Sequence, residues 1–436
     1  MNKVQIITLG CKVNQFESAS FRSGFEKAGL TTGGDRPADL VVINTCAVTN
    51  KAGAQSRQAI RQALRRNPDC RIVITGCYAE AAAADIADMP ELADRTFTII
   101  GNSEKHLLVR TALQEDNLPE QLIGDIMAAT EISRLPVGRF GDKTRAFLRV
   151  QDGCDSYCSY CIVPFTRGPS RSLPADEVVR QAAIFADAGH REIVVTGIHL
   201  GHYGRDLVGG PDLTGLLARL SAALPDMRYR ISSLEPIEIS EELLSLVASR
   251  PNLLPHLHIP LQSGDDEILG RMNRRYTAAR FAETIALCRR HLPDAAIGID
   301  ILVGFPGETE DHFERTRTFV EGLDCTYLHV FPYSDRPGTE ASSFRGKVAK
   351  PEKAKRVAEL MALGERKKIA FYRRQLGRSL PLLVESERSE AGLLKGYTDN
   401  YIPVQFAGPD SLMDRVVMVE LQQLDRTTVL GEVRER

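Results

Sequence analysis

Long apolar segments are missing from this 436-residue sequence. No run approaches the roughly 18 apolar residues that a membrane-spanning helix requires. The N-terminus holds only a short apolar run, residues 4–9, before Cys11 and Lys12, which is too little for the core of a secretory leader. We therefore expect a cytoplasmic protein with no membrane partner, whose thiols stay reduced.

An excess of either charge is also missing, because 55 basic residues face 57 acidic ones and the net charge is -2. This balance excludes a uniformly basic coat for nucleic acid but not a local basic patch. Apolar residues make up 43% of the chain and charged residues 26%, which supplies a packed core without the bias of a disordered chain. The length predicts about three domains.

The first third of the chain repeats a short apolar strand, a cysteine and a helix. Strands are predicted at residues 4–9, 40–43 and 71–75, with helices at 17–28 and 55–66. Cys11, Cys46 and Cys77 follow the strands and are 35 and 31 residues apart, about the length of one βαβ unit. Because parallel strands end at the same edge of a sheet, we expect these three cysteines to be neighbours.

Residues 114–143 are polar, contain two prolines and are predicted to be a linker with one short strand at 122–126. Six further strands alternate with helices beyond it. The strands are predicted at residues 146–150, 192–196, 229–233, 256–261, 296–303 and 327–332, and the helices at 175–188, 213–224, 240–248, 278–291 and 310–322. Six βα units are two short of a closed eight-stranded barrel, so we expect a partial, open (β/α)6 barrel with its active site at the C-terminal strand ends.

The end of the chain changes character twice. Residues 350–378 are predicted to be mainly helical and carry ten basic side chains against three acidic ones. Residues 379–436 are acidic, with ten acidic and six basic side chains, and hold short strands at 380–384, 392–396, 402–406, 415–421 and 428–432, a pattern typical of a small antiparallel β-barrel. The predicted α/β chain thus divides into domains at residues 1–115, 140–372 and 373–436.

The most specific motif is Cys154-Asp-Ser-Tyr-Cys158-Ser-Tyr-Cys161, which follows the first predicted barrel strand. Three thiolates suit an iron-sulfur cluster and leave one iron of a [4Fe-4S] cube open to a small bidentate ligand. A zinc knuckle is the alternative, although structural zinc wants four ligands and usually paired C-x2-C motifs. The cysteines that fit neither this triplet nor the N-terminal one are interpreted as structural: Cys70, Cys288 and Cys325.

This loop resembles the signature of radical S-adenosylmethionine enzymes. The resemblance implies that S-adenosylmethionine chelates the open iron and is cleaved to a 5′-deoxyadenosyl radical. It also implies contacts to this cofactor from residues at strand ends or beside the cysteines, namely Tyr160, Thr196, Gly197, Ser233, Glu235, Gln262, Val303 and Phe305. The alternative for each is structural, a core aromatic for Tyr160 and tight turns for the others. No catalytic residue is assigned.

Three N-terminal motifs narrow the resemblance to the methylthiotransferases. They are Gly10-Cys11-Lys-Val-Asn14-Gln-Phe-Glu-Ser, Asn44-Thr45-Cys46-Ala-Val-Thr and Thr75-Gly76-Cys77-Tyr-Ala. They resemble that family's N-terminal domain, and the C-terminal barrel resembles its TRAM domain, so the match covers nearly the whole chain. It implies that Cys11, Cys46 and Cys77 hold a second [4Fe-4S] cluster whose open iron carries the sulfur to be inserted. Three unrelated cysteines at strand ends are the alternative.

Members of this family replace an unactivated C-H bond by C-S-CH3, either on a hypermodified adenosine beside a tRNA anticodon or on an aspartate of a ribosomal protein. Such a bond has no acidic proton, so abstraction of a hydrogen atom by a radical explains two clusters in one chain. The motif around Cys11 resembles the branch that acts on N6-threonylcarbamoyladenosine (t6A). It differs from the isopentenyladenosine branch, which favours Met and Asp-Ser-Glu there.

The expected partners are a tRNA substrate, a reducing electron donor and a sulfur donor. The acidic C-terminal barrel would suit a basic protein instead, which keeps the ribosomal-protein aspartate as an alternative substrate. A non-enzymatic RNA-binding protein with structural clusters is a further alternative, but it leaves the open iron positions unexplained.

A basic helix face follows the Cys46 loop, where Arg57, Arg61 and Arg65 are spaced by four residues. These arginines, together with the basic cluster Arg366, Lys367 and Lys368, are predicted to hold the phosphate backbone of the tRNA. A solvated helix face is the alternative.

Overall fold

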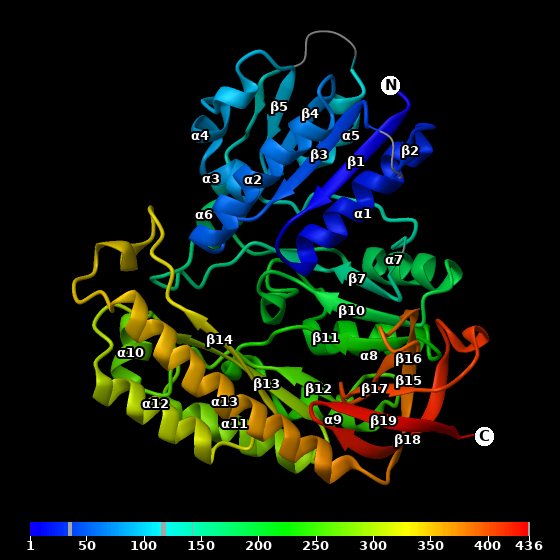
Figure 1. Cartoon of the computed structure of the whole chain (residues 1–436), viewed down its shortest axis with the longest axis vertical. Helices are drawn as coiled ribbons and strands as arrows, with labels where there is room; N and C mark the ends of the chain where they lie inside the picture. The colour runs from blue at the N-terminus through cyan, green and yellow to red at the C-terminus, as the bar shows by residue number, and fades with distance from the viewer. Residues whose placement is uncertain (34–36, 115–118, 142, 435–436) are drawn as a thin grey trace.

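A parallel sheet in the order β2-β1-β3-β4-β5-β6 forms the N-terminal unit of the computed structural model, which describes residues 1–33, 37–114, 119–141 and 143–434 (Figure 1). Its strands are β1 (Lys3–Thr8), β2 (Thr31–Thr32), β3 (Leu40–Thr45), β4 (Arg71–Gly76), β5 (Phe97–Ile100) and β6 (Gln121–Leu122). Its helices are α1 (Lys12–Lys27), α2 (Asn50–Arg66), α3 (Cys77–Ala81), α4 (Ala83–Ala87) and α5 (Leu108–Ala112). β3 is buried throughout, because helices cover both faces of the sheet. β1, β3 and β4 are adjacent, so their C-terminal ends meet at one edge as predicted.

Six parallel strands form the central unit. They are β7 (Arg145–Arg149), β10 (Glu192–Thr196), β11 (Arg228–Ile231), β12 (His256–His258), β13 (Ala296–Val303) and β14 (Tyr327–Pro332). Strand pairing runs β7-β10-β11 and β12-β13-β14, and isolated parallel bridges join β11 to β12. β7 and β14 do not pair with each other in the described chain, so this is the predicted open barrel of six strands.

Helices cover the outside of this open barrel (Figure 1). They are α7 (Ala175–Asp187), α8 (Leu213–Ala223), α9 (Glu241–Ser249), α10 (Asp266–Arg271), α11 (Ala278–His291) and α12 (Glu310–Gly322), and a short α6 (Val163–Arg167) and the two-residue strands β8 (Gln151–Asp152) and β9 (Arg171–Ser172) precede them. Five of these helices begin at an N-cap side chain that accepts a backbone N-H, which explains their sharp starts: Asp212, Ser240, Asp265, Thr277 and Thr309.

A long helix, α13 (Lys350–Gln375), leads to a closed C-terminal barrel in the order β15-β16-β17-β19-β18. The strands are β15 (Ser379–Arg388), β16 (Leu394–Thr398), β17 (Pro403–Phe406), β18 (Val416–Asp425) and β19 (Thr428–Arg434). The predicted small β-barrel is confirmed, and its neighbouring strands are antiparallel except for β17 and β19, which pair in parallel. Five strands in a closed ring cannot all alternate in direction, so one parallel pair is unavoidable.

The segment predicted to be a linker packs against the folded units. β6 adds to the N-terminal sheet, while Ile132, Leu135, Val137 and Phe140 are buried in the main core. The strand predicted at 122–126 is wrong beyond Leu122, because a 3-10 helix starts at Ile126. Residues 115–118 and 142 of this segment lie outside the described residues, as do the predicted boundary at 115 and the terminal residues 435–436. The domain division at 1–115, 140–372 and 373–436 stays a prediction.

No helix in the described part of the chain is both long enough and apolar enough to cross a membrane.

A buried carboxylate joins the central and C-terminal barrels. Glu192, at the start of β10, is fully buried and pairs with Arg145 at 3.1 Å, Arg228 at 3.2 Å and Arg230 at 2.9 Å. Arg145 also pairs with Glu385 of β15 at 3.1 Å, and Arg230 donates to the carbonyl oxygens of Thr398 and Asp399. Burial acts to raise the pKa of Glu192, but the three arginines outweigh it and lower the pKa to about 2.

We predict that Glu192→Gln destabilises the protein by about 3–5 kcal/mol at pH 7, because it leaves three buried arginines without their shared anion. The pKa of Glu192 is lower in the folded chain than its ordinary 4.5, so its charge stabilises the fold above pH 4.5 and this contribution is lost as the pH falls towards 2. Urea unfolding followed by circular dichroism should therefore show a large difference at pH 7 and a smaller one at pH 3.

Glu314→Gln is the matched control, because Glu314 forms a surface ion pair with Arg317 and its side chain is 45% exposed. Exposed ion pairs contribute little, so this variant should unfold like the wild type. Equal midpoints for the Glu192→Gln variant and the wild type at pH 7 would contradict the role assigned to Glu192.

Candidate active site

One cavity of about 480 Å³ lies between the N-terminal sheet edge and the C-terminal ends of the barrel strands. All six cysteines of the two predicted triplets line it: Cys11, Cys46, Cys77, Cys154, Cys158 and Cys161. We call this cavity the cysteine chamber. The three N-terminal cysteines are therefore neighbours, as the parallel strands predict. All nine cysteines of the chain are free thiols.

The N-terminal triplet sits on three adjacent strand ends. Cys11 follows β1 at the N-cap of α1, Cys46 follows β3, and Cys77 begins α3 directly after β4. Gly10 has a φ of +93°, and a Cβ there would lie 2.8 Å from the Cys46 sulfur. Because only glycine fits this position without strain, the turn after β1 can bring Cys11 close to Cys46.

The barrel triplet sits in a loop that neighbouring side chains brace. Asn273 donates to the carbonyl oxygen of Tyr157 at 2.9 Å, and Arg274 donates to the Cys158 sulfur at 3.3 Å. His199, just after β10, lies 3.4 Å from the Cys154 sulfur through Nδ1 and 2.6 Å from Glu238 through Nε2. Two cationic groups therefore face the sulfurs of this loop.

These cations oppose the effect of burial on the thiols. Burial raises the pKa of Cys46 to about 11 and that of Cys161 to about 12. Burial also acts to raise the pKa of Cys154, but the hydrogen bond and the charge of His199 outweigh it and lower that pKa. Metal binding requires thiolates, so the basic groups favour the charged form that a cluster would take.

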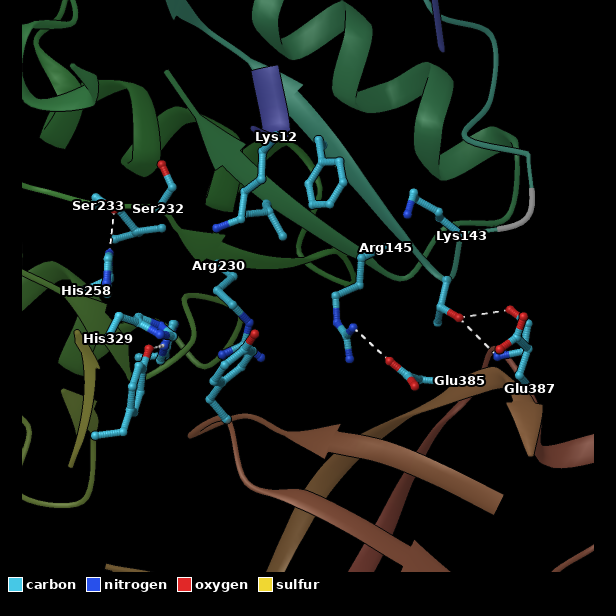
Figure 2. A pocket seen from close by; sticks show the side chains of 18 residues that line it. Lys12, Lys143, Arg145, Arg230, Ser232, Ser233, His258, His329, Glu385 and Glu387 are labelled. Carbon is cyan, nitrogen blue, oxygen red and sulfur yellow. Dashed lines mark hydrogen bonds and ion pairs between the residues drawn. The ribbon is translucent and has the colours of Figure 1, made fainter. Parts of the chain in front are cut away.

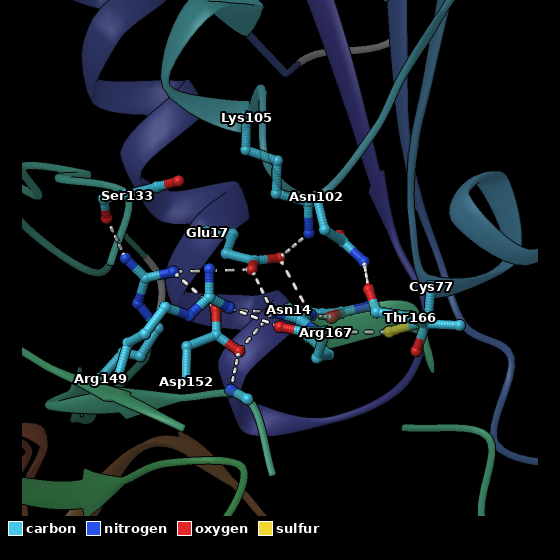
Figure 3. A network of polar contacts seen from close by, with 12 residues as sticks. Asn14, Glu17, Cys77, Asn102, Lys105, Ser133, Arg149, Asp152, Thr166 and Arg167 are labelled. Atoms are coloured by element: carbon cyan, nitrogen blue, oxygen red, sulfur yellow. Dashed lines mark hydrogen bonds and ion pairs between the residues drawn. The ribbon is translucent and has the colours of Figure 1, made fainter. Parts of the chain in front are cut away.

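A buried ionic network beside Cys77 joins the N-terminal unit to the central unit (Figure 3). The guanidinium of Arg167, in α6 of the central unit, donates to the Cys77 sulfur at 3.3 Å, to Glu17 at 2.6 Å and to Asn14 at 2.6 Å. It also pairs with Asp152 at 3.1 Å. Arg167 thus contacts three residues of the N-terminal unit from the end of the short helix that follows the barrel triplet.

Glu17 is the anion at the centre of this network and is fully buried in α1. It pairs with Arg167, with Lys105 and, at 3.8 Å, with Arg149. Burial acts to raise the pKa of Glu17, but the surrounding cations, Arg167 first, lower it overall. The network is therefore charged, with each ion matched by opposite charges.

The structure places five of the eight predicted S-adenosylmethionine contacts in the wall of the cysteine chamber: Tyr160, Thr196, Gly197, Ser233 and Glu235. The other three, Gln262, Val303 and Phe305, are not among the lining residues. Phe305 is fully buried and packs edge-on against Tyr333 and Phe344. The roles of all eight stay predictions.

The predicted RNA-binding residues lie on two distant parts of the molecule, α2 in the N-terminal unit and the C-terminal half of α13 (Figure 1). Several of them have protein partners. Arg57 donates to the Tyr78 hydroxyl at 2.5 Å, and Arg61 pairs with Glu91 at 2.7 Å. Lys367 donates to the carbonyl oxygens that end α12, and Lys368 pairs with Glu365 at 2.6 Å. Arg65 and Arg366 are exposed.

Sequence reasoning missed the groups that surround the sulfurs, namely Arg167, His199 and Arg274. Glu17 offered one signal, because it lies on the face of α1 that also buries Phe16, Phe21 and Phe25. A carboxylate on a buried helix face requires a buried cation. Which cation it pairs with depends on the tertiary fold.

The donor set fits iron-sulfur clusters better than single zinc ions. Only two groups of three or more potential ligand atoms lie within 4.8 Å of one another in the described residues, and neither contains a cysteine. Zinc holds thiolates at about 2.3 Å, which would bring three sulfurs closer together than that. A four-iron cube spreads three thiolates over three iron atoms, so the wider spacing suits it.

Two family models match the chain. The radical SAM superfamily matches residues 148–320, and a family described as uncharacterized protein family UPF0004 matches residues 3–98. The open barrel, its cysteine loop and this match define a radical S-adenosylmethionine enzyme, which implies S-adenosylmethionine and a [4Fe-4S] cluster as cofactors.

Relatives over nearly the full length identify the family. A Bacillus subtilis (strain 168) protein named threonylcarbamoyladenosine tRNA methylthiotransferase MtaB is 38% identical over 97% of this chain and 94% of its own. A Jannaschia sp. (strain CCS1) protein named tRNA-2-methylthio-N(6)-dimethylallyladenosine synthase is 30% identical over 99% and 94%. The chain belongs to the radical S-adenosylmethionine methylthiotransferase family.

A solved structure shares the fold. The radical S-adenosylmethionine methyltransferase TsrM from Kitasatospora setae, with cobalamin and a [4Fe-4S] cluster bound, aligns with a TM-score of 0.58 and 16% sequence identity, covering 78% of this chain and 77% of that one.

Proposed function

We propose that this protein converts t6A next to the anticodon of tRNA to its 2-methylthio derivative. The observation that carries the proposal is the cysteine chamber, where two cysteine triplets from separate folded units face one cavity. The relative named for this reaction shares 38% identity over nearly its whole length, against 30% for the one named for dimethylallyladenosine. The motif around Cys11 supports the same branch.

In this proposal Cys154, Cys158 and Cys161 hold the cluster that binds S-adenosylmethionine, and Cys11, Cys46 and Cys77 hold a second [4Fe-4S] cluster. When bound, these groups supply the radical and the sulfur for the reaction. The chain's own contribution is to orient them: Arg274 and His199 stabilise the charge on the barrel sulfurs, and Arg167 does so for Cys77. Tyr160, Thr196, Gly197, Ser233 and Glu235 are assigned to the S-adenosylmethionine side of the chamber.

A tRNA substrate also implies an RNA-binding surface, further reaction partners and a cellular location. The exposed basic residues of α2 and α13, including Arg65 and Arg366, are assigned to the RNA backbone. A reductant must supply electrons and a sulfur donor must renew the inserted atom, and the reaction is assigned to the cytoplasm. Methylthiolation of isopentenyladenosine or of a ribosomal-protein aspartate are the competing outcomes of the tests below.

Replacing each triplet by alanine should separate the two clusters. We expect the Cys154/Cys158/Cys161 variant to lose about half of the bound iron and all formation of 5′-deoxyadenosine, because it lacks the site that cleaves S-adenosylmethionine. The Cys11/Cys46/Cys77 variant should keep some 5′-deoxyadenosine formation but make no methylthio product. Iron analysis and chromatography of the reaction products measure both effects.

Cys288→Ala is the control, because Cys288 is a fully buried cysteine of α11 outside the chamber. It should keep both iron content and product. Complete product formation without the N-terminal cysteines would remove the second cluster from the proposal, and 5′-deoxyadenosine from the barrel variant would remove the first.

The substrate is tested in cells that lack the gene. Mass spectrometry of tRNA nucleosides should show loss of the methylthio form of t6A and accumulation of t6A itself, restored by the wild-type gene. Persistence of that nucleoside beside loss of methylthio-aspartate from a ribosomal protein, or of methylthio-isopentenyladenosine, would decide for one of the alternatives.

Changing Arg57, Arg61 and Arg65 to glutamate should weaken tRNA binding and flatten its dependence on salt, because each phosphate contact adds nearly one unit to the slope of log K against log salt. Binding assays at several salt concentrations measure this. The variant Arg280→Glu, at an exposed position of α11, is the control for added negative charge. An unchanged slope in the triple variant would mean that the basic face of α2 is a solvated helix face and does not bind tRNA.

A further inference from the structure

A second cavity, of about 510 Å³, continues from the cysteine chamber into the interior of the open barrel (Figure 2). We call it the lumen pocket. Lys12, Ser232 and Ser233 line both cavities, so the two adjoin. The far side of the lumen pocket is closed by the C-terminal barrel, through Glu385, Ser386, Glu387 and Tyr401.

Four cationic side chains line the lumen pocket: Lys12, Lys143, Arg145 and Arg230. The two arginines already have partners within the protein. Arg145 pairs with Glu192 and Glu385, and Arg230 pairs with Glu192 and donates to two carbonyl oxygens of the C-terminal barrel. Both guanidinium groups therefore already have acceptors within the fold.

The two lysines differ from the arginines. In the described residues neither the Lys12 nor the Lys143 ammonium has a hydrogen bond or an ion pair within 4.0 Å. Lys143 lies on the same side of the view as Glu385 and Glu387 but apart from them, whereas Lys12 reaches in from the start of α1 next to Ser232 (Figure 2). Only Lys12 is shared with the cysteine chamber, and it directly follows Cys11.

The wall that faces Lys12 is polar. Ser233 is hydrogen-bonded to Nδ1 of His258 at 2.5 Å, and Nε2 of His258 contacts Asp300 at 2.9 Å. The contact between His258 and Asp300 holds Ser233 in place, and in the described residues no ion pair within 4.0 Å joins Asp300 to Lys12, so the Lys12 ammonium is left to a ligand. An unpaired ammonium in a partly enclosed cavity favours an anionic ligand group.

We infer that the lumen pocket receives the N6 substituent of the substrate adenosine and that the Lys12 ammonium binds its threonyl carboxylate. The inference rests on the proposed function. Carbon 2 and N6 lie on the same edge of adenine, so a base whose carbon 2 faces the cysteine chamber extends its N6 group into the adjoining pocket. Lys12, at the boundary of the two cavities, is the unpaired cation that this group meets there.

The inference is tested with the reconstituted enzyme and two anticodon stem-loop RNAs, one carrying t6A and one in which the threonyl carboxylate is a neutral methylamide. Hydrogen bonds to a charged group predict a preference of about ten- to hundred-fold in kcat/KM for the carboxylate form. Lys12→Gln should reduce this preference to nearly one, Lys12→Arg should keep most of it, and Lys143→Gln should keep it. Iron content and 5′-deoxyadenosine formation of each variant report whether the clusters survive beside the changed residue.

A second measurement uses unchanged protein. A carbodiimide converts the threonyl carboxylate of t6A RNA bound to the wild-type holoenzyme to an O-acylisourea. The amine of a contacting lysine, after it loses a proton, attacks this ester, releases the urea and forms an amide bond. Mass spectrometry should find the adduct on Lys12. An adduct on Lys143 instead, or an unchanged preference in Lys12→Gln, overturns the assignment of Lys12.

The two failures can be told apart. Wild-type enzyme that methylthiolates t6A RNA without preferring it to the methylamide overturns the role of Lys12 alone. Wild-type enzyme that modifies neither RNA overturns the proposed function and this inference together.

Discussion

A single buried guanidinium, that of Arg167, makes one active site out of two folded units. Removing an arginine and a glutamate from water costs several kcal/mol for each ion, so the pair persists only where further hydrogen bonds complete it. Here Glu17, Asp152, Asn14 and the Cys77 sulfur use the donors of Arg167 on both sides of the interface. A shift of one unit against the other would leave buried charges unmatched, so this network holds the N-terminal unit in its place on the central barrel.

A second buried carboxylate with several cationic partners joins the central barrel to the C-terminal barrel. Glu192 is surrounded by Arg145, Arg228 and Arg230, as Glu17 is by Lys105, Arg149 and Arg167. Both carboxylates are fully buried, and both have a pKa lowered by the surrounding cations. Apolar packing alone tolerates small sliding motions, whereas a buried carboxylate that pairs with three cations loses ion pairs when the units shift.

Short-range sequence patterns predict most of the helices and strands of the fold. The strands at 192–196, 296–303 and 327–332 and the helices at 278–291 and 310–322 have the predicted ends, because apolar periodicity and N-cap side chains are local signals. The convergence of Cys11, Cys46 and Cys77 could also be predicted, since parallel strands end at one edge, but the shared cavity with the barrel triplet could not. Arg167, Arg274 and His199 could not, because their partners lie far away in the sequence. The packing of the predicted linker against the core could not be predicted either, because its scattered apolar residues have no period that identifies a buried segment.

The contact between Arg230 and the loop at Thr398 and Asp399 bears on the modularity of the chain. Small β-barrels at the end of a protein are usually treated as portable units that can be exchanged or trimmed. In this protein the C-terminal barrel supplies the carbonyl oxygens that fix Arg230 and the side chain of Tyr401, both of which line the lumen pocket. A shortened chain or a hybrid with another barrel would therefore lose part of the wall of the lumen pocket as well as the barrel itself.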